Sequence, residues 1–440
     1  KERYPYYEGE IEEFRKTFPL NEIHARILDS MVLDHHSKSK RAVLHILHNG
    51  PFESVNFPLG GTEFYCADII RHTNDVSHWS LVPHKDSYRL TMHLNGLHRV
   101  YTVKREVERL IQILTSPVFS ITHLHSTSLY TEKEIEAMGK TDNMIVSIHD
   151  QRMICPETYC FAKNGRVCTG SECTEWCAYS HDSIEKYRKR SAKILSGARQ
   201  IICFSESSLS LIKGILKPEA QTKIIPHGIP SALASTDKIY PTLENSPFTV
   251  AFIGILPIHK GGLIINELTK RPSLPSGKEV KWHIVGDFSL PEVQDHLAVV
   301  HGRYCREALS GILKNINPHV AIFLSLCHET YSITVDEALN VGIPVIVTPY
   351  GAPPERVKSH GGGWVLDDLS VKGILNLLDR ISSNTKEYIE KQAKASKAPI
   401  ISLDEEMKRI SCIYKENFPF NTKKPVKTLK GFIIEAGGLL

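Results

Sequence analysis

Two acidic residues stand close together after a short apolar run in the second half of the chain. The run VAIFLSL spans 320–326, Glu329 follows it, and seven residues separate Glu329 from Glu337. A carboxylate at Glu337, one or two turns into a helix, can accept hydrogen bonds from the two neighbouring hydroxyls of a ribose. Glu329 would stand in front of that helix, where an attached sugar would lie. Either glutamate alone is explained as a turn or capping residue, so only the pair in its surroundings favours a binding site.

The residues between the two glutamates predict the start of a helix. We expect it to begin near Tyr331 and Ser332, and Thr334 and Glu337 have the spacing of a capping box. A helix that follows a parallel strand directs unpaired N–H groups and a positive dipole end out of the sheet, which suits a phosphate. The pattern therefore predicts binding of a phosphorylated sugar.

Strand-like and helical runs alternate along most of the chain, which predicts an α/β fold with parallel sheets. One series starts at AVLHILH (42–48) and a second at FTVAFIG (248–254). Each first strand is followed by a long loop ending in Gly-Gly, at 60–61 and 261–262, and then by a helix. We expect two Rossmann-like, doubly wound domains that face each other across a cleft. The expected organisation is a lead-in at 1–41, a first domain at 42–228 with a Cys-rich insert at 155–177, a linker at 229–247, a second domain at 248–402, and a helix with a basic tail at 403–440.

Four local expectations belong to the first domain. Thr62 is expected to be the N-cap of the helix that follows the first Gly-Gly pair. The segments SHWSLVPH and YRLTMHL are expected to be strands, and the charged segment near 104–114 is expected to be a helix.

Composition excludes several classes of protein. Of 440 residues, 41% are hydrophobic and 23% are charged, which is the balance of a folded globular chain. The net charge is +4, from 53 basic and 49 acidic residues, and gives no electrostatic reason to expect a nucleic-acid partner. No apolar run approaches the roughly 18 residues that a membrane span requires. The first residues lack the order of a signal peptide, and they leave open a fragment, a processed chain or other domains of a larger polypeptide.

The segment from Glu329 to Glu355 resembles the retaining family-4 glycosyltransferases. Glu329 and Glu337 match the E-x7-E signature of that family, and PVIVTPYGAPPERV resembles its strand and Gly-rich loop, which ends in a Glu (here Gly351 and Glu355). With GGGW at 361–364, the sequence most resembles the bacterial surface-polysaccharide, O-antigen and lipopolysaccharide branch, over about residues 42–400. The resemblance implies the GT-B fold, which has two Rossmann-like domains.

The resemblance also implies donor-binding residues. Lys260, in GILPIHKGG, matches a Lys that grips the donor diphosphate. Ile255 stands where the family has an Arg, a departure that removes charge-assisted bonds to phosphate; His259 is either a compensating or a solvated residue. Gly61, in PLGGTEF (58–64), matches the Gly-rich loop of the first domain. The implied donor-binding set is Gly61, Lys260, Thr330, Tyr331, Ser332 and Glu337.

The first domain contributes polar residues at strand ends. His149, in NMIVSIHD, matches the family His that contacts the donor sugar, so Glu329 and His149 are the implied catalytic residues. For each His, a satisfied polar residue at a strand end is the alternative. The implied reaction needs no metal or other cofactor: Lys260 and the helix start stabilise the leaving diphosphate, and a nucleophilic role for Glu329 stays open. The acceptor-side candidates are His123, His125, Asp150 and Arg152.

Five cysteines stand within 23 residues of the first domain. Their spacings, C-x4-C, C-x7-C, C-x4-C and C-x3-C, agree only in part with those of zinc ribbons. Free thiols that pack a loop, a structural zinc and disulfides all stay open. We expect the cluster to shape the acceptor side of the cleft without a catalytic role. The five are Cys155, Cys160, Cys168, Cys173 and Cys177.

These observations together predict a hexosyltransferase that moves a sugar from a nucleotide-diphosphate sugar to a polysaccharide or lipid-linked glycan. The alternatives are a different GT-B enzyme (an epimerase or a phosphorylase), a non-catalytic GT-B domain of a larger protein, and a zinc-dependent binding module. The expected location is the cytoplasm, with peripheral contact at the inner face of the cytoplasmic membrane as an alternative. The basic face EKYRKRSAK (185–193) is expected to be solvated or to meet anionic lipid.

Overall fold

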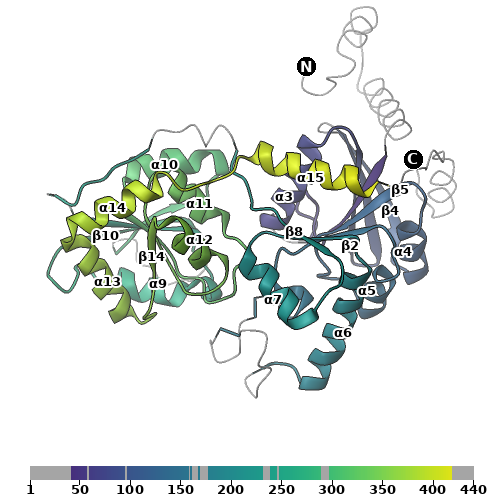
Figure 1. Cartoon of the computed structure of the whole chain (residues 1–440), viewed down its shortest axis with the longest axis horizontal. Helices are drawn as coiled ribbons and strands as arrows, with labels where there is room; N and C mark the ends of the chain where they lie inside the picture. The colour runs from purple at the N-terminus through teal and green to yellow at the C-terminus, as the bar shows by residue number, and fades with distance from the viewer. Residues whose placement is uncertain are drawn as a thin grey trace, which may run out of the picture.

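A computed structural model shows two lobes, each built around one β-sheet (Figure 1). The first lobe contains strands β1 to β8 and the second contains strands β9 to β14. The predicted α/β class is therefore confirmed. The structure describes residues 41–56, 59–94, 97–157, 159–160, 167–168, 177–230, 238–244, 247–288 and 297–418.

The first lobe has an eight-stranded sheet in the order β4-β3-β2-β1-β5-β6-β7-β8. Strands β2, β1, β5, β6, β7 and β8 are parallel, and β3 and β4 are antiparallel to their neighbours. The strands are β1 (Ala42–Ile46), β2 (Ser77–His84), β3 (Ser87–Leu94), β4 (Leu97–Lys104), β5 (Phe119–Leu124), β6 (Met144–Ser147), β7 (Gln200–Cys203) and β8 (Gln221–Ile224), and the helices are α3 (Gly61–His72), α4 (Val107–Leu114), α5 (Glu132–Met138), α6 (His181–Gly197) and α7 (Glu206–Leu216).

The first sheet differs from expectation in one respect. The sheet is mixed rather than wholly parallel, because β2, β3 and β4 form an antiparallel meander at one edge. The helix expected near 104–114 is confirmed as α4, which begins at Val107, after Lys104 has ended β4. The β-branched and aromatic run VYTV at 100–103 favours the strand.

The second lobe has a six-stranded, wholly parallel sheet in the order β11-β10-β9-β12-β13-β14. Its central strands are almost continuously buried and apolar, as parallel strands covered on both faces require. The strands are β9 (Phe248–Ile255), β10 (Val280–Asp287), β11 (Val299–Gly302), β12 (Val320–Phe323), β13 (Val345–Val347) and β14 (Gly363–Val365), and the helices are α9 (Gly262–Thr269), α10 (Leu309–Ile316), α11 (Ile333–Asn340), α12 (Ala352–His360), α13 (Val371–Ser383) and α14 (Thr385–Ala395).

The Gly-Gly pairs hold equivalent places in the two lobes, as predicted. Gly60 is the N-cap of α3 and Gly61 is its first residue, while Gly261 and Gly262 have the same positions at α9. Thr62 therefore lies inside α3 and is not its N-cap, which corrects that expectation. Instead, the Gly60 N–H donates a 2.9 Å hydrogen bond to the carboxylate of Glu63.

The last helix of the described residues, α15 (Leu403–Asn417), returns to the first lobe and packs along α3 (Figure 1). The chain thus passes between the lobes twice, and the two passages are bonded to each other. Ile229 donates to the carbonyl of Ile401 at 3.1 Å and accepts from the N–H of Leu403 at 2.7 Å. Gly228 has no room for a Cβ here, because it would overlap the carbonyl of Ser402.

Candidate active site

Three loops at the carboxyl ends of neighbouring strands in the second lobe meet around Glu329. The Lys260 ammonium, in the loop after β9, forms an ion pair with the Glu329 carboxylate, in the loop after β12. The hydroxyl of Ser325 donates to the same carboxylate at 2.5 Å. From the loop after β13, the Ala352 N–H donates to the Glu329 carbonyl at 2.9 Å. The structure therefore brings together two of the residues singled out in the sequence.

Glycine is required where two of these loops approach other main-chain atoms. Gly351 has φ +74° and ψ −148°, and a Cβ there would overlap the main-chain N and O of Glu329. Gly261 has φ +81°, and a Cβ there would overlap Leu324. Both conformations are readily adopted by glycine alone, so these two positions fix how closely the loops pack around Glu329.

The Lys260–Glu329 pair is charged at neutral pH. Burial alone would raise the pKa of Glu329, but the Lys260 ammonium and two hydrogen bonds hold it below its usual value. Burial likewise opposes the charge on Lys260, but the Glu329 carboxylate raises the pKa of Lys260 above its usual value. The site therefore holds a fixed positive and a fixed negative charge side by side.

Glu337 has a partner that the sequence did not reveal. Its carboxylate lies 3.2 Å from Nε of Arg306, in the loop after β11. The same guanidinium lies 3.5 Å from Asp68 on α3 and donates at 2.9 Å to the carbonyl of Gly228. Burial raises the pKa of Glu337, against the lowering effect of Arg306. Arg306 thus ties the carboxylate of the second lobe to the first lobe.

The capping box expected at Thr334 and Glu337 does not form. Ser332 is the N-cap of α11, in the left-handed region at φ +74°, and no side chain caps the helix. Glu337 lies beyond the first turn and pairs with Arg306 instead. The predicted helix start near Tyr331 and Ser332 is confirmed, and α11 begins without the side-chain acceptor that an ordinary cap supplies.

The segment around Thr330 joins the two lobes. Its hydroxyl donates to the His149 carbonyl at 2.8 Å, and its carbonyl accepts from the hydroxyl of Ser205 at 2.9 Å. Gln151 donates from its side chain to the carbonyl of His328 at 2.8 Å. Glu329 therefore lies at the interface between the second lobe and the carboxyl end of β6.

Tyr331 is buried at the same junction. Its ring joins the apolar cluster formed by α3 and α15, and only 5% of the residue is exposed. Its hydroxyl contacts the carbonyl of His227 at 3.1 Å and the carboxylate of Asp336 at 2.6 Å. The side chain of Tyr331 thus has a structural role, and only its main chain remains available to a ligand.

The predicted polar residues of the first lobe lie either near the site, just after β6, or buried inside the lobe. His149 lies at the end of β6, partly exposed, and Asp150 caps a short 3₁₀ turn by accepting from the N–H of Arg152 at 2.8 Å. His123 and His125 are buried. His123 contacts the hydroxyls of Tyr414 and Ser147, both at 2.8 Å, so its two ring nitrogens are already used inside the lobe.

Gly61 and Ile255 have open surroundings. A Cβ on Gly61 would meet no atom within 4 Å, so packing does not require glycine at this position. Ile255 is 59% exposed at the end of β9. Near it, the ring of His259 stacks on Tyr159 of the Cys-rich segment, with centroids 3.8 Å apart and planes 16° apart. The Cys-rich segment therefore reaches across to the loop that carries Lys260.

Four of the five clustered cysteines lie within the described residues. Cys155 and Cys160 belong to the apolar core of the first lobe, Cys168 and Cys177 pack against that core, and none of these four is in a disulfide. A hydrogen bond from Cys160 lowers the pKa of Cys155 to about 7. Cys173 lies outside the described residues.

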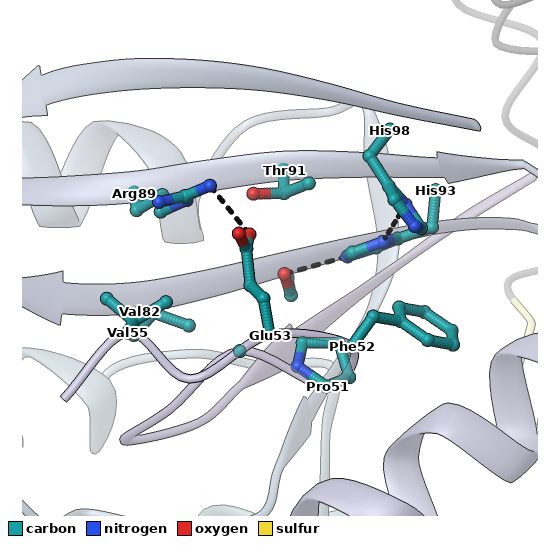
Figure 2. Close-up of a pocket in the computed structure, with 11 residues that line it drawn as sticks. Pro51, Phe52, Glu53, Val55, Val82, Arg89, Thr91, His93 and His98 are labelled. Atoms are coloured by element: carbon teal, nitrogen blue, oxygen red, sulfur yellow. Dashed lines mark hydrogen bonds and ion pairs between the residues drawn. The ribbon is translucent and has the colours of Figure 1, made fainter. Parts of the chain in front are cut away.

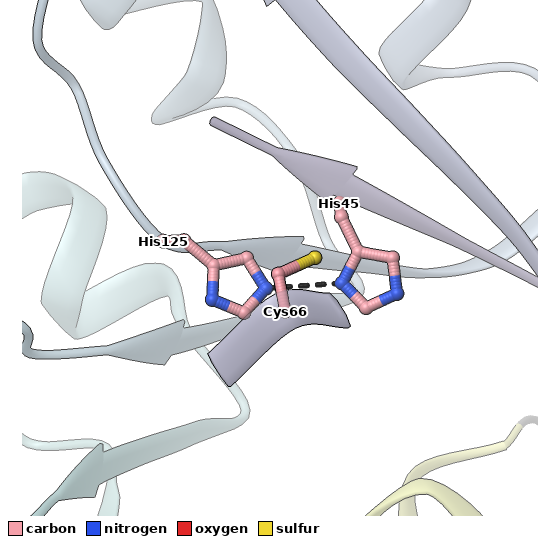
Figure 3. Close-up of side chains that lie close together, drawn as sticks. All are labelled: His45, Cys66 and His125. Atoms are coloured by element: carbon pink, nitrogen blue, oxygen red, sulfur yellow. Dashed lines mark hydrogen bonds between the residues drawn. The ribbon is translucent and has the colours of Figure 1, made fainter. Parts of the chain in front are cut away.

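A different group of side chains has the spacing of metal ligands. Within the described part of the chain, the ligand atoms of His45, Cys66 and His125 lie within 4.8 Å of one another, and all three residues are buried (Figure 3). The two facing imidazole nitrogens are 3.0 Å apart, so they also satisfy each other by a hydrogen bond. This hydrogen bond therefore explains why the ligand atoms lie close together, and no ion is required.

A small hollow lies on the meander at the edge of the first sheet (Figure 2). Two pairs of polar side chains line it: Arg89 with Glu53 at 2.6 Å, and His93 with His98 at 2.9 Å. The hollow lies on β2, β3 and β4, whereas Glu329 lies against the end of β6, so the hollow is not part of the candidate site.

The basic face of α6 is partly neutralised. Arg190 pairs with Glu132 and Glu136, and Lys189 pairs with Glu185. In the part of the chain that the structure describes, no helix combines the length and the apolar character that crossing a bilayer requires.

Comparisons with known proteins agree with this arrangement. Residues 243–398 match the family model described as Glycosyl transferases group 1. A search of curated protein sequences gives no match. Among solved structures, the chain is similar to sucrose-phosphate synthase (tll1590) from Thermosynechococcus elongatus, with TM-score 0.59 and 13% identity over 86% of this chain and 99% of that one.

Two further solved structures give the same result. Anabaena Alr3699/HepE in complex with UDP has TM-score 0.56 and 15% identity over 86% of this chain and all of that one. The lipopolysaccharide outer core galactosyltransferase WaaB has TM-score 0.52 and 14% identity over 85% and 99%. At these identities the likeness concerns the fold. The two lobes therefore have the GT-B arrangement of two Rossmann-like domains, with the candidate site where they meet.

Proposed function

We propose that this protein is a retaining glycosyltransferase that moves a hexose-type sugar from a nucleotide-diphosphate sugar to a glycan or lipid-linked acceptor. The observation that carries the proposal is the meeting of Lys260, Glu329 and the Gly351 loop at the edge of the second sheet, against the His149 end of β6. The match of 243–398 to the group 1 glycosyl transferases and the GT-B fold support it.

The charged pairs of the site suit the two ends of such a donor. The Lys260 ammonium and the uncapped start of α11 supply positive charge for a diphosphate. Glu337 accepts hydrogen bonds from ribose hydroxyls while Arg306 holds its carboxylate in place. Gly61, which leaves open space beside its main chain, begins α3, directly after the loop of the first lobe that approaches the donor.

The reaction breaks the bond between the anomeric carbon and the diphosphate, and the electron pair leaves with the diphosphate. The acceptor hydroxyl oxygen bonds to the anomeric carbon on the same face, and its proton passes to the leaving phosphate oxygen. Lys260 and the N–H groups at the start of α11 stabilise the charge that develops on the leaving group. Glu329 stabilises the positive charge that develops on the sugar, and His149 contacts the sugar from the first lobe.

Ile255 favours one second candidate, a GT-B protein that binds a nucleotide but transfers no sugar. The side chain is 59% exposed and supplies no guanidinium where the family has one. This candidate predicts nucleotide binding without turnover, and the experiment below separates it from the first.

The test uses the full chain and a panel of nucleotide-diphosphate sugars. A true donor should stabilise the fold against heat, by about 2.7 kcal/mol at a hundredfold excess over its Kd. With that donor and a panel of glycan acceptors, we expect release of the nucleoside diphosphate and an anomeric configuration of the product that matches the donor. Lys260→Ala and Glu329→Gln should abolish release, and Lys270→Ala, an exposed lysine beside α9, should not. Stabilisation without any glycosidic product would support the second candidate, and no stabilisation by any nucleotide sugar would overturn both.

A further inference from the structure

Five side chains of the first lobe form one continuous line of hydrogen bonds that starts at His149. His149 Nε2 lies 3.2 Å from His125 Nδ1, and His125 Nε2 lies 3.0 Å from His45 Nδ1. His45 Nε2 lies 3.0 Å from His78 Nδ1. His78 Nε2 ends the line at Thr73, 3.0 Å from its carbonyl and 2.8 Å from its hydroxyl. We call these five residues the histidine chain.

The end of the chain fixes the direction of every hydrogen bond in it. The carbonyl of Thr73 can only accept, and the Thr73 hydroxyl gives its own proton to the carbonyl of Ile69 at 2.6 Å. Both contacts at His78 Nε2 therefore require an N–H there. A neutral His78 then has a lone pair on Nδ1, so His45 must donate from Nε2.

The same elimination continues toward the site. Because His45 donates from Nε2, its Nδ1 accepts, and His125 must donate from Nε2. His125 Nδ1 then accepts from His149 Nε2. His149 therefore carries its proton on Nε2, and its Nδ1 keeps a lone pair.

This assignment of protons requires neutral imidazoles, and the surroundings of these rings favour the neutral form. His45 and His125 are buried, and His78 is 3% exposed. Burial, reinforced by the neighbouring imidazoles, lowers the pKa of His45, of His125 and of His149 well below its usual value. A proton added to any of these rings would introduce a buried charge beside other imidazoles.

We propose that His125, His45, His78 and Thr73 are positioning residues that fix the tautomer of His149, so that His149 meets its ligand as a hydrogen-bond acceptor. The partner for such a nitrogen is a hydroxyl, and a sugar hydroxyl fits where a phosphate oxygen does not. This last step rests on the proposed function, since it assumes that a sugar lies against His149. It also implies that His149 gives no proton to the leaving diphosphate.

The test reads the tautomer directly in the full chain. With [15N]histidine labelling, long-range 1H–15N correlation spectra distinguish Nε2–H, Nδ1–H and doubly protonated rings. The His149 signals are identified by their loss in His149→Asn. We expect the Nε2–H form in the wild type at pH 7.5. An Nδ1–H form or a doubly protonated ring would overturn the proposal.

Two variants at His78 test whether the chain sets that form. His78→Phe keeps a ring but removes the acceptor for His45, and we expect a mixture of tautomers at His149. His78→Asn restores an oxygen near the place of Nδ1, and we expect the Nε2–H form to return. The control is His98→Phe, which removes an imidazole from the separate His93–His98 pair and should change nothing at His149. If His78→Phe folds and the tautomer of His149 is unchanged, the proposal is contradicted. If His78→Phe does not fold, His45→Phe provides the same test.

Metal content gives an independent reading. If the purified protein held one zinc or copper ion on His45, Cys66 and His125, both facing nitrogens would be lone pairs. His125 would then donate from Nδ1 and His149 would carry its proton on Nδ1, which would overturn the proposal. We expect no stoichiometric metal.

Ligand binding separates this proposal from the proposed function. We expect His78→Phe to weaken binding of the stabilising nucleotide sugar about twofold for an even mixture of tautomers, because only the molecules with Nε2–H keep the hydrogen bond to the sugar, and to leave binding of the nucleoside diphosphate alone unchanged. If the tautomer is as proposed but no nucleotide sugar binds, the proposed function fails and the histidine chain stands. If sugar transfer occurs with His149 in the other tautomer, the histidine chain fails and the function stands.

Discussion

The carboxylate of Glu355, on α12 of the second lobe, accepts a 2.8 Å hydrogen bond from the main-chain N–H of Ser207, on α7 of the first lobe. The same carboxylate accepts from the N–H of Glu206 at 3.2 Å. A side chain of one lobe thus satisfies N–H groups at the start of a helix in the other, where a negative charge is most favourable.

Glu355→Ala should loosen the contact between the lobes. We expect the free energy of unfolding to fall by about 1 kcal/mol, and the radius of gyration measured by X-ray scattering to increase. The matched control is Glu390→Ala, which removes an exposed i,i+4 pair with Lys394 and should change neither quantity. Identical scattering from Glu355→Ala and wild type would show that other contacts hold the lobes.

Replacement of Lys260 should destabilise the protein in a pH-dependent way. Lys260→Met leaves the Glu329 carboxylate without its counter-charge, and we expect a loss of about 1–3 kcal/mol at pH 7, between the values for exposed and buried pairs. Lys270→Met, which breaks an exposed pair with Glu267, is the control and should cost less than about 0.5 kcal/mol.

The sign of the pH effect follows from the two pKa shifts. The pKa of Glu329 is lowered in the folded state, so its contribution is present above its unfolded pKa of about 4.3 and is lost as pH falls through the folded value. The pKa of Lys260 is raised, so its contribution is lost as pH rises through its folded value. Urea unfolding should therefore show the full difference between wild type and Lys260→Met at pH 7 and a smaller one below about pH 4. A difference that does not change with pH would show that the charges do not cause it.

Ile255→Arg should strengthen donor binding. The side chain is 59% exposed at the end of β9, and a guanidinium there can form charge-assisted hydrogen bonds with a diphosphate. We expect the nucleotide sugar to bind about fivefold more tightly by calorimetry, with stability changed by less than about 0.5 kcal/mol. Leu263→Arg is the control: it adds the same charge at a position 54% exposed on α9, and a comparable gain there would reveal only a general effect of charge.

Gly351→Ala should be among the more damaging substitutions in the second lobe. Its backbone lies in a region that is essentially restricted to glycine, and the new Cβ would overlap the main chain of Glu329. We expect a loss of about 3 kcal/mol or more in the free energy of unfolding. At Gly277, φ is +87° but a Cβ would meet no atom within 4 Å, so Gly277→Ala should cost only about 1 kcal/mol. If both substitutions lowered the free energy of unfolding equally, the overlap with Glu329 would contribute nothing to the cost at Gly351.

The parts of the fold that were predictable are those with strong local signals. The buried runs that became β1, β9 and β12 are short and apolar, and the Gly-Gly pairs mark the starts of α3 and α9. Strand β4 was missed although the sequence has Asn-Gly at 95–96, a typical hairpin signal, just before it. The β-branched and aromatic run at 100–103 is a second local signal for this strand.

The partners within the site could not be predicted, because tertiary packing decides them. Arg306 reaches Glu337 across 31 positions and Asp68 across 238, and no local pattern relates them. The capping box failed for the same reason, since Glu337 pairs with a distant guanidinium instead of its own helix start. His45 and His78 gave no signal of their own, because imidazoles on buried strands acquire a role only when neighbouring strands align them.

The double passage between the lobes has a mechanical consequence. Since Ile229 is bonded to both Ile401 and Leu403, the two connecting segments bend as one ribbon. We therefore expect the lobes to move relative to each other about this shared hinge. Cleavage between 230 and 238 would leave the halves tethered through the second passage, and α15 would remain anchored on α3. A nicked molecule should therefore still sediment as a single particle.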